Sequence, residues 1–139
     1  MEENHNIKCL QDNEIKEAMI TADEQDECYK LALNIDGKNL TAEADNYFYA
    51  LVELRKKAEA ENIKILCKGC CKNVYPSPMI LSMGDAIKAY ILTLNQSAVM
   101  KNLVEIFDPC ELDDYATVEE QEEFYNLWIN SITKKDIHS

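Results

Sequence analysis

The clearest pattern in the chain is the alternation of Tyr29, Leu31, Leu33 and Ile35 with Lys30, Ala32 and Asn34. A period of two is typical of a half-buried strand, and we predict one here. It ends at Asp36-Gly37, whose glycine tolerates positive φ and predicts a turn. Upstream, the apolar run in Glu14–Thr21 is too short to distinguish a strand from a short helix. Residues 1–12 show no usable period, so we expect a loose lead-in.

The hydrophobic period becomes helical from Thr41 onward. Thr41 is the predicted N-cap, because acidic residues follow it in the first turn and lysines lie towards the far end. One stripe of this helix is apolar and must face a sheet or another helix. The stripe consists of Ala44, Tyr47, Phe48, Leu51, Leu54 and Ala58.

Further strands are predicted by short apolar runs at Ile63–Lys68 and Leu103–Phe107. Between these runs, the segment Asn73–Pro78 contains two prolines, which favour an extended or turning loop over a helix. The segment Gly84–Leu94 fits both periods, and its β-branched residues favour a strand. The middle of the chain is therefore expected to be mostly extended.

A C-terminal helix is predicted by Thr117 and Glu120, which have the spacing of a capping box. Apolar residues then recur at helical spacing, and we expect Trp128 on this stripe to lie in the core. Helices and strands are intermixed without regular β-α alternation. The sequence therefore predicts one α+β domain over residues 1–139, with a mainly antiparallel sheet packed with a central helix and a C-terminal helix.

Length and charge narrow the function. The chain has 139 residues, the size of one domain, and 26 Asp and Glu against 14 Lys and Arg give a net charge of −12. Such an excess disfavours nucleic acid and anionic membranes as ligands, and it attracts basic partners. We expect the partner to be a basic protein, with no nucleic acid and no membrane bound.

The start of the chain, Met1–His5, is acidic and has none of the basic and apolar regions of a secretory signal. No apolar run approaches the length of a membrane span. We therefore expect a cytoplasmic protein. Its 6 cysteines would then be free thiols or metal ligands rather than a disulfide framework.

The densest group of possible metal ligands is Cys67, Cys70 and Cys71. Cys67 and Cys70 have a spacing that suits zinc, but a structural zinc site needs four ligands, and the sequence offers no second pair. A dithiol redox role would require a helix beginning at Cys67, which the downstream prolines disfavour. We expect no metal and no cofactor, and keep a small cysteine-based metal-binding or thiol regulatory module as the alternative function. The remaining cysteines are isolated in sequence: Cys9, Cys28 and Cys110.

Signals for catalysis are poor. His5 and His138 lie near the chain ends, where order is least expected, which disfavours histidine-assisted hydrolases. Gly37, Gly69 and Gly84 are too far apart for a phosphate-binding loop. An enzyme that uses carboxylates alone is the least favoured reading. We predict no catalytic residue and expect that the protein is not an enzyme.

Candidate partner-binding residues lie in two acidic clusters and in the proline-containing loop. Loop positions leave acidic side chains free to meet a partner, and a tyrosine combines a large apolar body with a polar tip. The predicted partner-binding residues are Asp23, Glu24, Asp26, Glu27, Tyr75, Asp108, Glu111, Asp113 and Asp114.

A family resemblance is carried by Lys72–Met79 (KNVYPSPM) and Ser82–Tyr90 (SMGDAIKAY), and continues in Leu103–Asp108 and Val118–Tyr125. Over about the last half of its length, the chain resembles small bacterial immunity proteins of polymorphic toxin systems, including contact-dependent growth inhibition. It departs from that pattern at Asp85-Ala86, where a second glycine would follow Gly84.

The resemblance implies a cytoplasmic, non-catalytic protein that binds and neutralises a cognate toxin domain. It also implies that Asn73, Tyr75, Pro76 and Gly84 hold the fold more than they touch the toxin. Many toxin domains are basic nucleases, and an acidic inhibitor can occupy the groove meant for phosphates. The expected partner is therefore a cationic nuclease.

Overall fold

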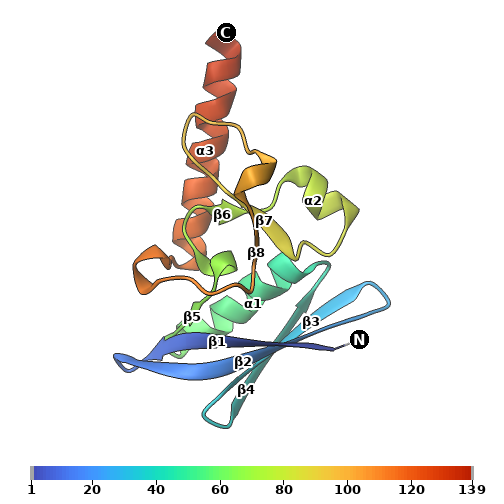
Figure 1. The fold of residues 1–139 in the computed structure, drawn as a ribbon, viewed down its shortest axis with the longest axis vertical. Coiled ribbons are helices and arrows are strands. Elements are labelled where there is room, and N and C mark those ends of the chain that lie inside the picture. Colours follow the sequence, from blue (N-terminus) through green and yellow to red (C-terminus); the bar gives the residue numbers. More distant parts are fainter. Residues whose placement is uncertain (1, 139) are drawn as a thin grey trace.

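The computed structural model describes the backbone of residues 2–138 and the side chains of residues 2–82 and 84–133. This part of the chain forms an α+β fold with antiparallel sheets, as the sequence predicts (Figure 1). The strands and helices are β1 (Glu3–Gln11), β2 (Glu14–Gln25), β3 (Cys28–Ile35), β4 (Lys38–Ala44), α1 (Tyr47–Ala60), β5 (Ile63–Leu66), β6 (Val74–Tyr75), α2 (Pro78–Met83), β7 (Lys88–Ile91), β8 (Leu103–Glu105) and α3 (Val118–His138). Single 3-10 turns are η1 (Lys68–Cys70), η2 (Met100–Asn102) and η3 (Leu112–Asp114).

The larger sheet has five strands in the order β4-β3-β2-β1-β5, all antiparallel. Two-residue turns join its first four strands, and both residues of each turn have positive φ, which matches the right-handed twist of the strands. The turns are Asp12-Asn13, Asp26-Glu27 and Asp36-Gly37.

Helix α1 packs on one face of the larger sheet, mainly against β3, β4 and β5, and the inward apolar residues of all five strands belong to the same core (Figure 1). Its N-cap is Asn46, whose Oδ1 accepts a hydrogen bond from the backbone N–H of Tyr49 at 2.8 Å. The predicted stripe is confirmed at Tyr47, Phe48, Leu51, Leu54 and Ala58.

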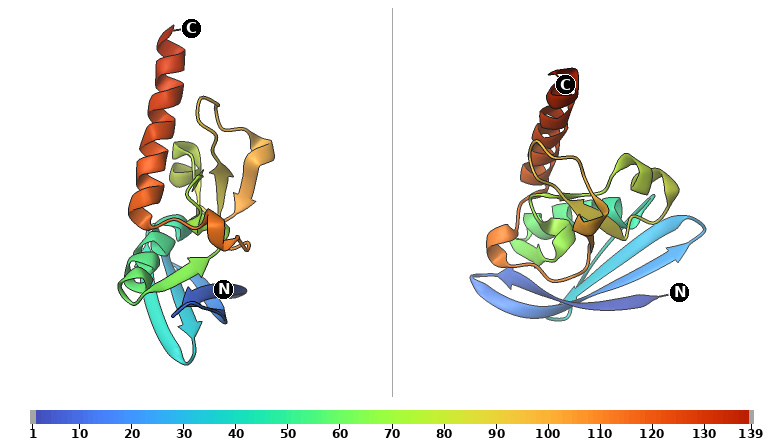
Figure 2. Two further views of the ribbon diagram at one scale, coloured as in Figure 1. Left: turned by 90° about the vertical axis from the view of Figure 1, so that its left-hand side faces the viewer. Right: turned by 45° about the horizontal axis from the view of Figure 1, so that its top comes forward.

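A second layer lies on the other side of α1. It consists of the small sheet β6-β7-β8, with α2 beside it and α3 running along it (Figure 2). The predicted capping box is confirmed, because the Thr117 N–H donates to Glu120 Oε1 at 2.8 Å and the Glu120 N–H donates to Thr117 Oγ1 at 3.1 Å. Trp128 is buried as expected, and its Nε1 donates to the carbonyl of Gln96 at 2.9 Å.

A buried polar network joins α1, η1 and α3. The Arg55 guanidinium, 1% exposed, donates to Gln121 Oε1 at 2.6 Å and to the carbonyl of Ala116 at 2.7 Å. Gln121 in turn donates to the carbonyls of Gly69, Cys71 and Val74. Gly69 is required here, because a Cβ would lie 2.5 Å from Leu51 Cδ2.

Two sequence predictions about element boundaries are wrong. Residues 1–12 are not a loose lead-in, because Glu3–Gln11 forms β1, between β2 and β5. Thr41 is not a helix N-cap, because it lies in β4 and pairs with Ala32 of β3. Backbone pairing with β3 extends the strand through Ala44, and α1 begins only after Asn46.

The other segments mostly follow the sequence. Residues 14–21 belong to a strand, β2, which continues through most of the predicted acidic turn to Gln25. The strands predicted after residues 63, 84 and 103 are β5, β7 and β8. The proline-containing segment is not wholly a loop, because Pro78 is the first residue of α2, a position where its missing N–H costs nothing. Not every apolar residue at helical spacing in α3 is buried, because Leu127, next to the buried Trp128, is 59% exposed.

Candidate functional site

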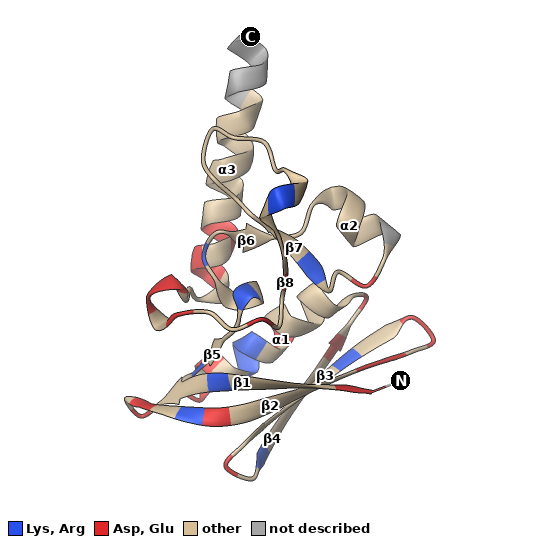
Figure 3. Ribbon diagram, viewed as in Figure 1, with Lys and Arg blue, Asp and Glu red and all other residues tan. Residues whose placement is uncertain are grey.

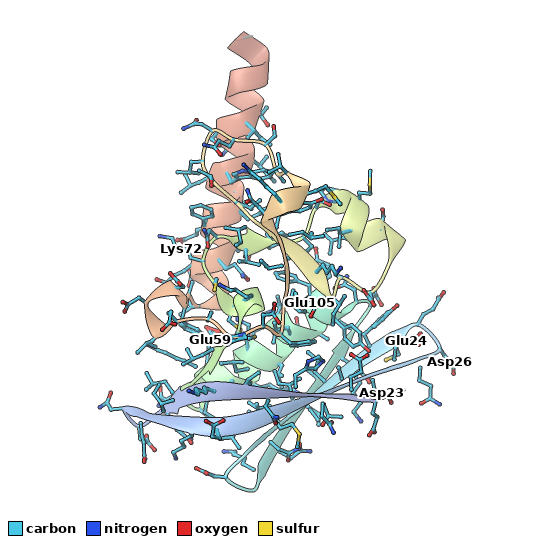
Figure 4. All side chains as sticks on the ribbon, in the orientation of Figure 1. Asp23, Glu24, Asp26, Glu59, Lys72 and Glu105 are labelled. Atoms are coloured by element: carbon cyan, nitrogen blue, oxygen red, sulfur yellow. The ribbon has the colours of Figure 1, made fainter. Side chains whose placement is uncertain are left out.

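The β2–β3 hairpin carries the first acidic cluster at its tip. Asp26 and Glu27 form the two-residue turn, with φ of 53° and 64°. The Glu27 N–H donates to Glu24 Oε1 at 3.0 Å, which links the turn to the last residues of β2. Asp23 and Glu24 are therefore strand residues rather than loop residues, and correct the expectation that the whole cluster lies in a loop. Figure 4 shows Asp23, Glu24 and Asp26 together at this end of the sheet.

Acidic residues from other segments join this cluster around two tyrosines. The rings of Tyr29 and Tyr47 meet edge to face, with centroids 4.8 Å apart. Glu3 lies on β1 opposite Ala22 of β2, next to the cluster. We call this surface the acidic tyrosine patch; it consists of Glu3, Glu24, Glu27, Tyr29, Tyr47 and Asp85, with Asp23 at its rim on the outer face of the sheet.

Burial and the patch carboxylates raise the pKa values of both tyrosines. Burial raises the pKa of Tyr47 to about 12, with further contributions from Asp85, Asp23, Glu3 and Glu24. Burial, followed by Glu24, Asp85 and Glu27, also raises the pKa of Tyr29. Both phenols therefore keep their protons at neutral pH, and can donate hydrogen bonds from within a negative field.

Asp85 is fixed at the start of α1 by two hydrogen bonds. Its carbonyl accepts from the backbone N–H of Tyr47 at 2.6 Å, and its Oδ1 accepts from the N–H of Ile87 at 3.1 Å. The segment before β7, distant in sequence, is thus tied to the same edge as the hairpin.

At Asp26 the first acidic cluster reaches the outer face of the sheet. There it lines a hollow of about 410 Å³ together with Asp23, Lys30 and Glu43. Lys30 is paired across the strands with Asp23, so this side of the hairpin carries both signs of charge.

The second predicted cluster lies on one segment, which we call the acidic loop, residues 108–114. Asp108, Glu111, Asp113 and Asp114 are all exposed. The carbonyls of Asp108 and Asp114 accept hydrogen bonds from the backbone N–H groups of Lys68 and Lys72, at 2.7 and 3.1 Å. The loop therefore runs along a lysine-containing segment around η1.

The structure does not bring the two clusters together. The β2–β3 turn and η3 of the acidic loop lie on opposite sides of the view in Figure 3, each with Asp and Glu positions coloured red. Only the start of the loop is closer to the patch, because Asp108 follows Phe107, whose ring centroid is 6.3 Å from that of Tyr47. The strand register supports this separation. The first residue of β1, Glu3, lies opposite Ala22, near the β2–β3 turn. The Cys110 N–H instead donates to the carbonyl of Leu66, which pairs with Lys8 in the second half of β1. A single partner footprint on both clusters would have to span the sheet.

Tyr75 belongs to neither acidic surface. Its ring stacks on Tyr125 at 3.8 Å between centroids and meets Phe48 at 4.9 Å. It lines a groove between α1 and α3 with Tyr49 and Glu122, and burial raises its pKa. The structure thus places this predicted contact residue in the packing between two helices.

Sequence reasoning missed Glu3, Tyr29, Tyr47 and Asp85 as members of the patch. Glu3 was assigned to a loose lead-in, and the tyrosines to apolar faces. The acidic N-terminal segment and the acidic hairpin are both present in the sequence. That they lie side by side follows only from the β1–β2 register.

The remaining candidate chemistry is placed as follows. His5 is not in a disordered end: it lies in β1, with its ring 4.6 Å from that of Phe107 and its Nε2 3.6 Å from Glu3 Oε2. The side chain of His138 lies outside the described residues.

Among the described side chains, no group of three or more His, Cys, Asp or Glu is placed to hold a metal ion. No described helix has both the length and the apolarity to cross a membrane.

Comparison of the sequence with protein-family models and with curated proteins finds no match. The function of the chain is therefore argued from its own residues and geometry.

Proposed function

We propose that this chain is an immunity-type inhibitor that binds a cationic toxin domain, a nuclease, through the acidic tyrosine patch. The observation that carries the proposal is the convergence of carboxylates from β1, β2, the β2–β3 turn and the segment before β7 on the Tyr29–Tyr47 pair. The protein acts by binding, without catalysis, in the cytoplasm where such a toxin would act.

The composition of the patch suits recognition of a basic protein. Tyrosine is enriched among the residues that dominate binding energies, because it buries a large ring and keeps a hydroxyl for hydrogen bonding. Surrounding carboxylates attract lysines and arginines and accelerate encounter. Tyr47 is buried and Tyr29 is half-buried, so a cationic side chain would meet the accessible part of the Tyr29 ring and the carboxylates of Glu24, Glu27 and Asp85 near it.

The backbone of the turn supports the same assignment. All three hairpin turns of the sheet have Asp at the first position, but the second positions are Asn13, Glu27 and Gly37. Asn and Gly tolerate positive φ, whereas a left-handed conformation costs other residues roughly 1–2 kcal/mol. Glu27 at φ 64° therefore retains a carboxylate at a stability cost, which is expected where the side chain has a role in binding.

The proposal is tested with a toxin domain encoded directly upstream of this chain. Co-expression should rescue growth, and the purified pair should associate at submicromolar concentration in calorimetry. The double variant Asp23→Lys/Glu24→Lys should lose both rescue and association, while a matched reversal on α3, Glu119→Lys/Glu122→Lys, should keep them. If wild-type protein fails to associate, or if the two reversals behave alike, the proposal is wrong.

A further inference from the structure

Strand β4 forms a free edge of the larger sheet. In the described part of the chain it is an outermost strand and pairs only with β3. The seven residues of β4, Lys38–Ala44, pair with β3 in one continuous register, without a bulge or a proline. Such an edge exposes a row of unpaired N–H and C=O groups, which can hydrogen-bond a strand of another chain.

Every second residue of β4 points its backbone groups away from β3. The two-residue turn Asp36-Gly37 is closed by the pair Ile35↔Lys38, which in such a hairpin exchanges both backbone hydrogen bonds. From that pair onward, hydrogen-bonded and free positions alternate along β4. A contact from α1 agrees with this alternation, because Lys57 Nζ donates to the carbonyl of Thr41 at 2.5 Å. The residues whose backbone groups face the free edge are therefore Asn39, Thr41 and Glu43.

The edge is accessible to another chain. A hollow of about 400 Å³ lies beside it and is lined by residues of β3, β4 and α1. Asn39 and Glu43 are exposed, and Thr41 is half-buried. Among the described residues, the hydrogen bond from Lys57 is the only one that reaches an outward backbone group of β4. The edge therefore has room and free hydrogen-bonding groups for a further strand.

We propose that β4 pairs with β4 of a second copy of this chain, antiparallel and across a twofold axis at Thr41. Of the registers in which outward positions face each other, this one pairs all seven residues of β4, and every shift shortens the overlap. The contact is isologous, so each interaction occurs twice. The two sheets join into one continuous sheet without any change in the strand pairing inside either copy.

The side chains of β4 are complementary to their copies in this register. Asn39 lies opposite Glu43 of the second copy, so its amide N–H can donate to that carboxylate, and Leu40 lies opposite Ala42. No two like charges face each other, whereas a register centred on Glu43 would oppose two carboxylates. The strand carries one lysine and one glutamate, so this edge is free of the acidic excess with which other parts of the chain would repel a second copy.

Lys57 competes with a second strand for this edge. Its ammonium group occupies the carbonyl of Thr41, which lies at the proposed axis and would accept the Thr41 N–H of the second copy. Pairing therefore exchanges one exposed hydrogen bond in each copy for the backbone hydrogen bonds of the outward residues. A lysine at an edge is a common protection against strand addition, so removing Lys57 should strengthen the dimer.

Sedimentation velocity, from low micromolar to submillimolar concentration, should show a monomer that converts to a dimer. Each chain has a net charge of −12, so salt screens the repulsion between copies and should strengthen the dimer. Amide exchange measured by NMR at the two ends of this range should slow in the dimer at Asn39, Thr41 and Glu43. It should not change at Leu40 and Ala42, whose N–H groups already bind β3.

Matched variants on two neighbouring strands test the register. Asn39→Lys places a lysine opposite Glu43 in both halves of the dimer, so we expect the dissociation constant to fall about threefold or more. Asn39→Asp opposes two carboxylates instead and should raise the constant by about as much. Asn34→Lys and Asn34→Asp are the controls, because Asn34 is exposed, pairs with Asn39 in the same copy and lies one strand away from the edge. These controls change the net charge equally and should shift the constant by less than about twofold.

Removal of the competing lysine gives an independent test. Lys57→Ala should strengthen the dimer, while the exposed Lys56→Ala, with the same change in net charge, should not. A chain that stays monomeric over the whole concentration range overturns the proposal, and so does a dimer in which the Asn39 and Asn34 variants behave alike. Slower exchange at the outward amides of β4 that appears only with a different protein would assign the edge to that protein, and would overturn the proposal as well.

Discussion

Side chains of the acidic tyrosine patch come from separate elements, whereas those of the acidic loop come from one stretch of seven residues, 108–114. In the patch, carboxylates surround two buried or half-buried tyrosines. In the loop, they project outward from a backbone that is hydrogen-bonded to the segment containing Lys68 and Lys72. The two regions share a sign of charge and differ in what the charge surrounds.

This difference favours the patch over the acidic loop as the surface that binds a partner. The exposed charges of the loop project from a single backbone segment, so they act on a basic partner mainly through long-range attraction. Charges that converge on rings create a site with an apolar centre and a charged rim, as in many protein interfaces. Counting acidic residues along the sequence gives the two regions equal weight, but the structure arranges their carboxylates differently.

The largest effect should follow from removing Arg55, whose hydrogen bonds to Ala116 and Gln121 hold the chain just after the acidic loop. Arg55→Leu leaves the carbonyl of Ala116 and the amide oxygen of Gln121 buried without their donor. Each unpaired group costs about 1–3 kcal/mol, so we expect a loss of about 2–6 kcal/mol in the free energy of unfolding measured in urea. The neighbouring exposed Lys56→Leu should stay within about 0.5 kcal/mol of the wild type.

Affinity of the Arg55→Leu protein for its partner, measured well below the melting temperature, should change little, because Arg55 contacts Ala116 and Gln121, whereas the patch lies at the first turn of α1. A large loss of affinity with the fold intact would mean that the loop end contacts the partner, and would invert the comparison.

Charge reversal compares the two acidic regions directly. Asp23→Lys/Glu24→Lys places like charges against a cationic partner, which costs several kcal/mol, so we expect affinity to fall by about 100-fold or more. Asp113→Lys/Asp114→Lys in the loop should lower it by less than about fivefold, mostly through the association rate. Binding kinetics at two salt concentrations would measure both effects. Equal losses from the two reversals would show that net charge alone governs association.

Replacing Glu27 sharpens the same comparison within a single turn. Glu27→Gly relieves the left-handed conformation, so we expect a gain of about 1 kcal/mol in stability, together with weaker binding. The equivalent change in the first turn, Asn13→Gly, should alter stability less and leave binding unchanged, because Asn already tolerates this conformation. Thermal denaturation and calorimetry on the two variants test it. A stability loss in Glu27→Gly would remove the strain argument for the turn.

Much of the fold could be predicted because its signals are local. The alternation in residues 29–35, the stripe on α1 and the Thr117–Glu120 capping box each depend on residues close in sequence. β1 and β4 lacked such signals. The inward positions of β1 include His5 as well as Ile7 and Cys9, and those of β4 include the small Ala42, so neither strand has a strong apolar period. Their strand conformation depends on pairing with neighbours.

The candidate site could be predicted only in part for the same reason. Asp23, Glu24 and Glu27 stand out as an acidic cluster in any reading of the sequence. Glu3 joins them through the β1–β2 register, and Asp85 through a backbone hydrogen bond to Tyr47, whose position 38 residues earlier no local pattern connects with it. Long-range pairing decides which of the many acidic residues share a surface.

The smallest effect concerns the ionisation of the tyrosines in the two regions. Tyr47 has a pKa of about 12 in the folded protein, above the ordinary value of 10.0, because of burial and then the patch carboxylates. The unfolded chain therefore releases this proton at lower pH, and the contribution of Tyr47 to stability, complete below pH 10, is lost as the pH rises towards 12. Tyr47→Phe keeps the ring and should retain more of its neutral-pH stability in this window.

Salt separates Tyr47 from Tyr115, which follows the acidic loop. The pKa of Tyr115 is also raised, by burial first and then by the buried Cys70, with smaller effects from Glu59 and Glu120. Added salt screens exposed charges more than buried ones, so it should lower the pKa of Tyr47 more than that of Tyr115. Tyrosinate absorbance, compared between wild type and the Tyr47→Phe and Tyr115→Phe variants, measures each group. If salt moves both tyrosines equally, the carboxylates around Tyr47 do not create a distinct field, and the patch loses the property that distinguishes it from the acidic loop.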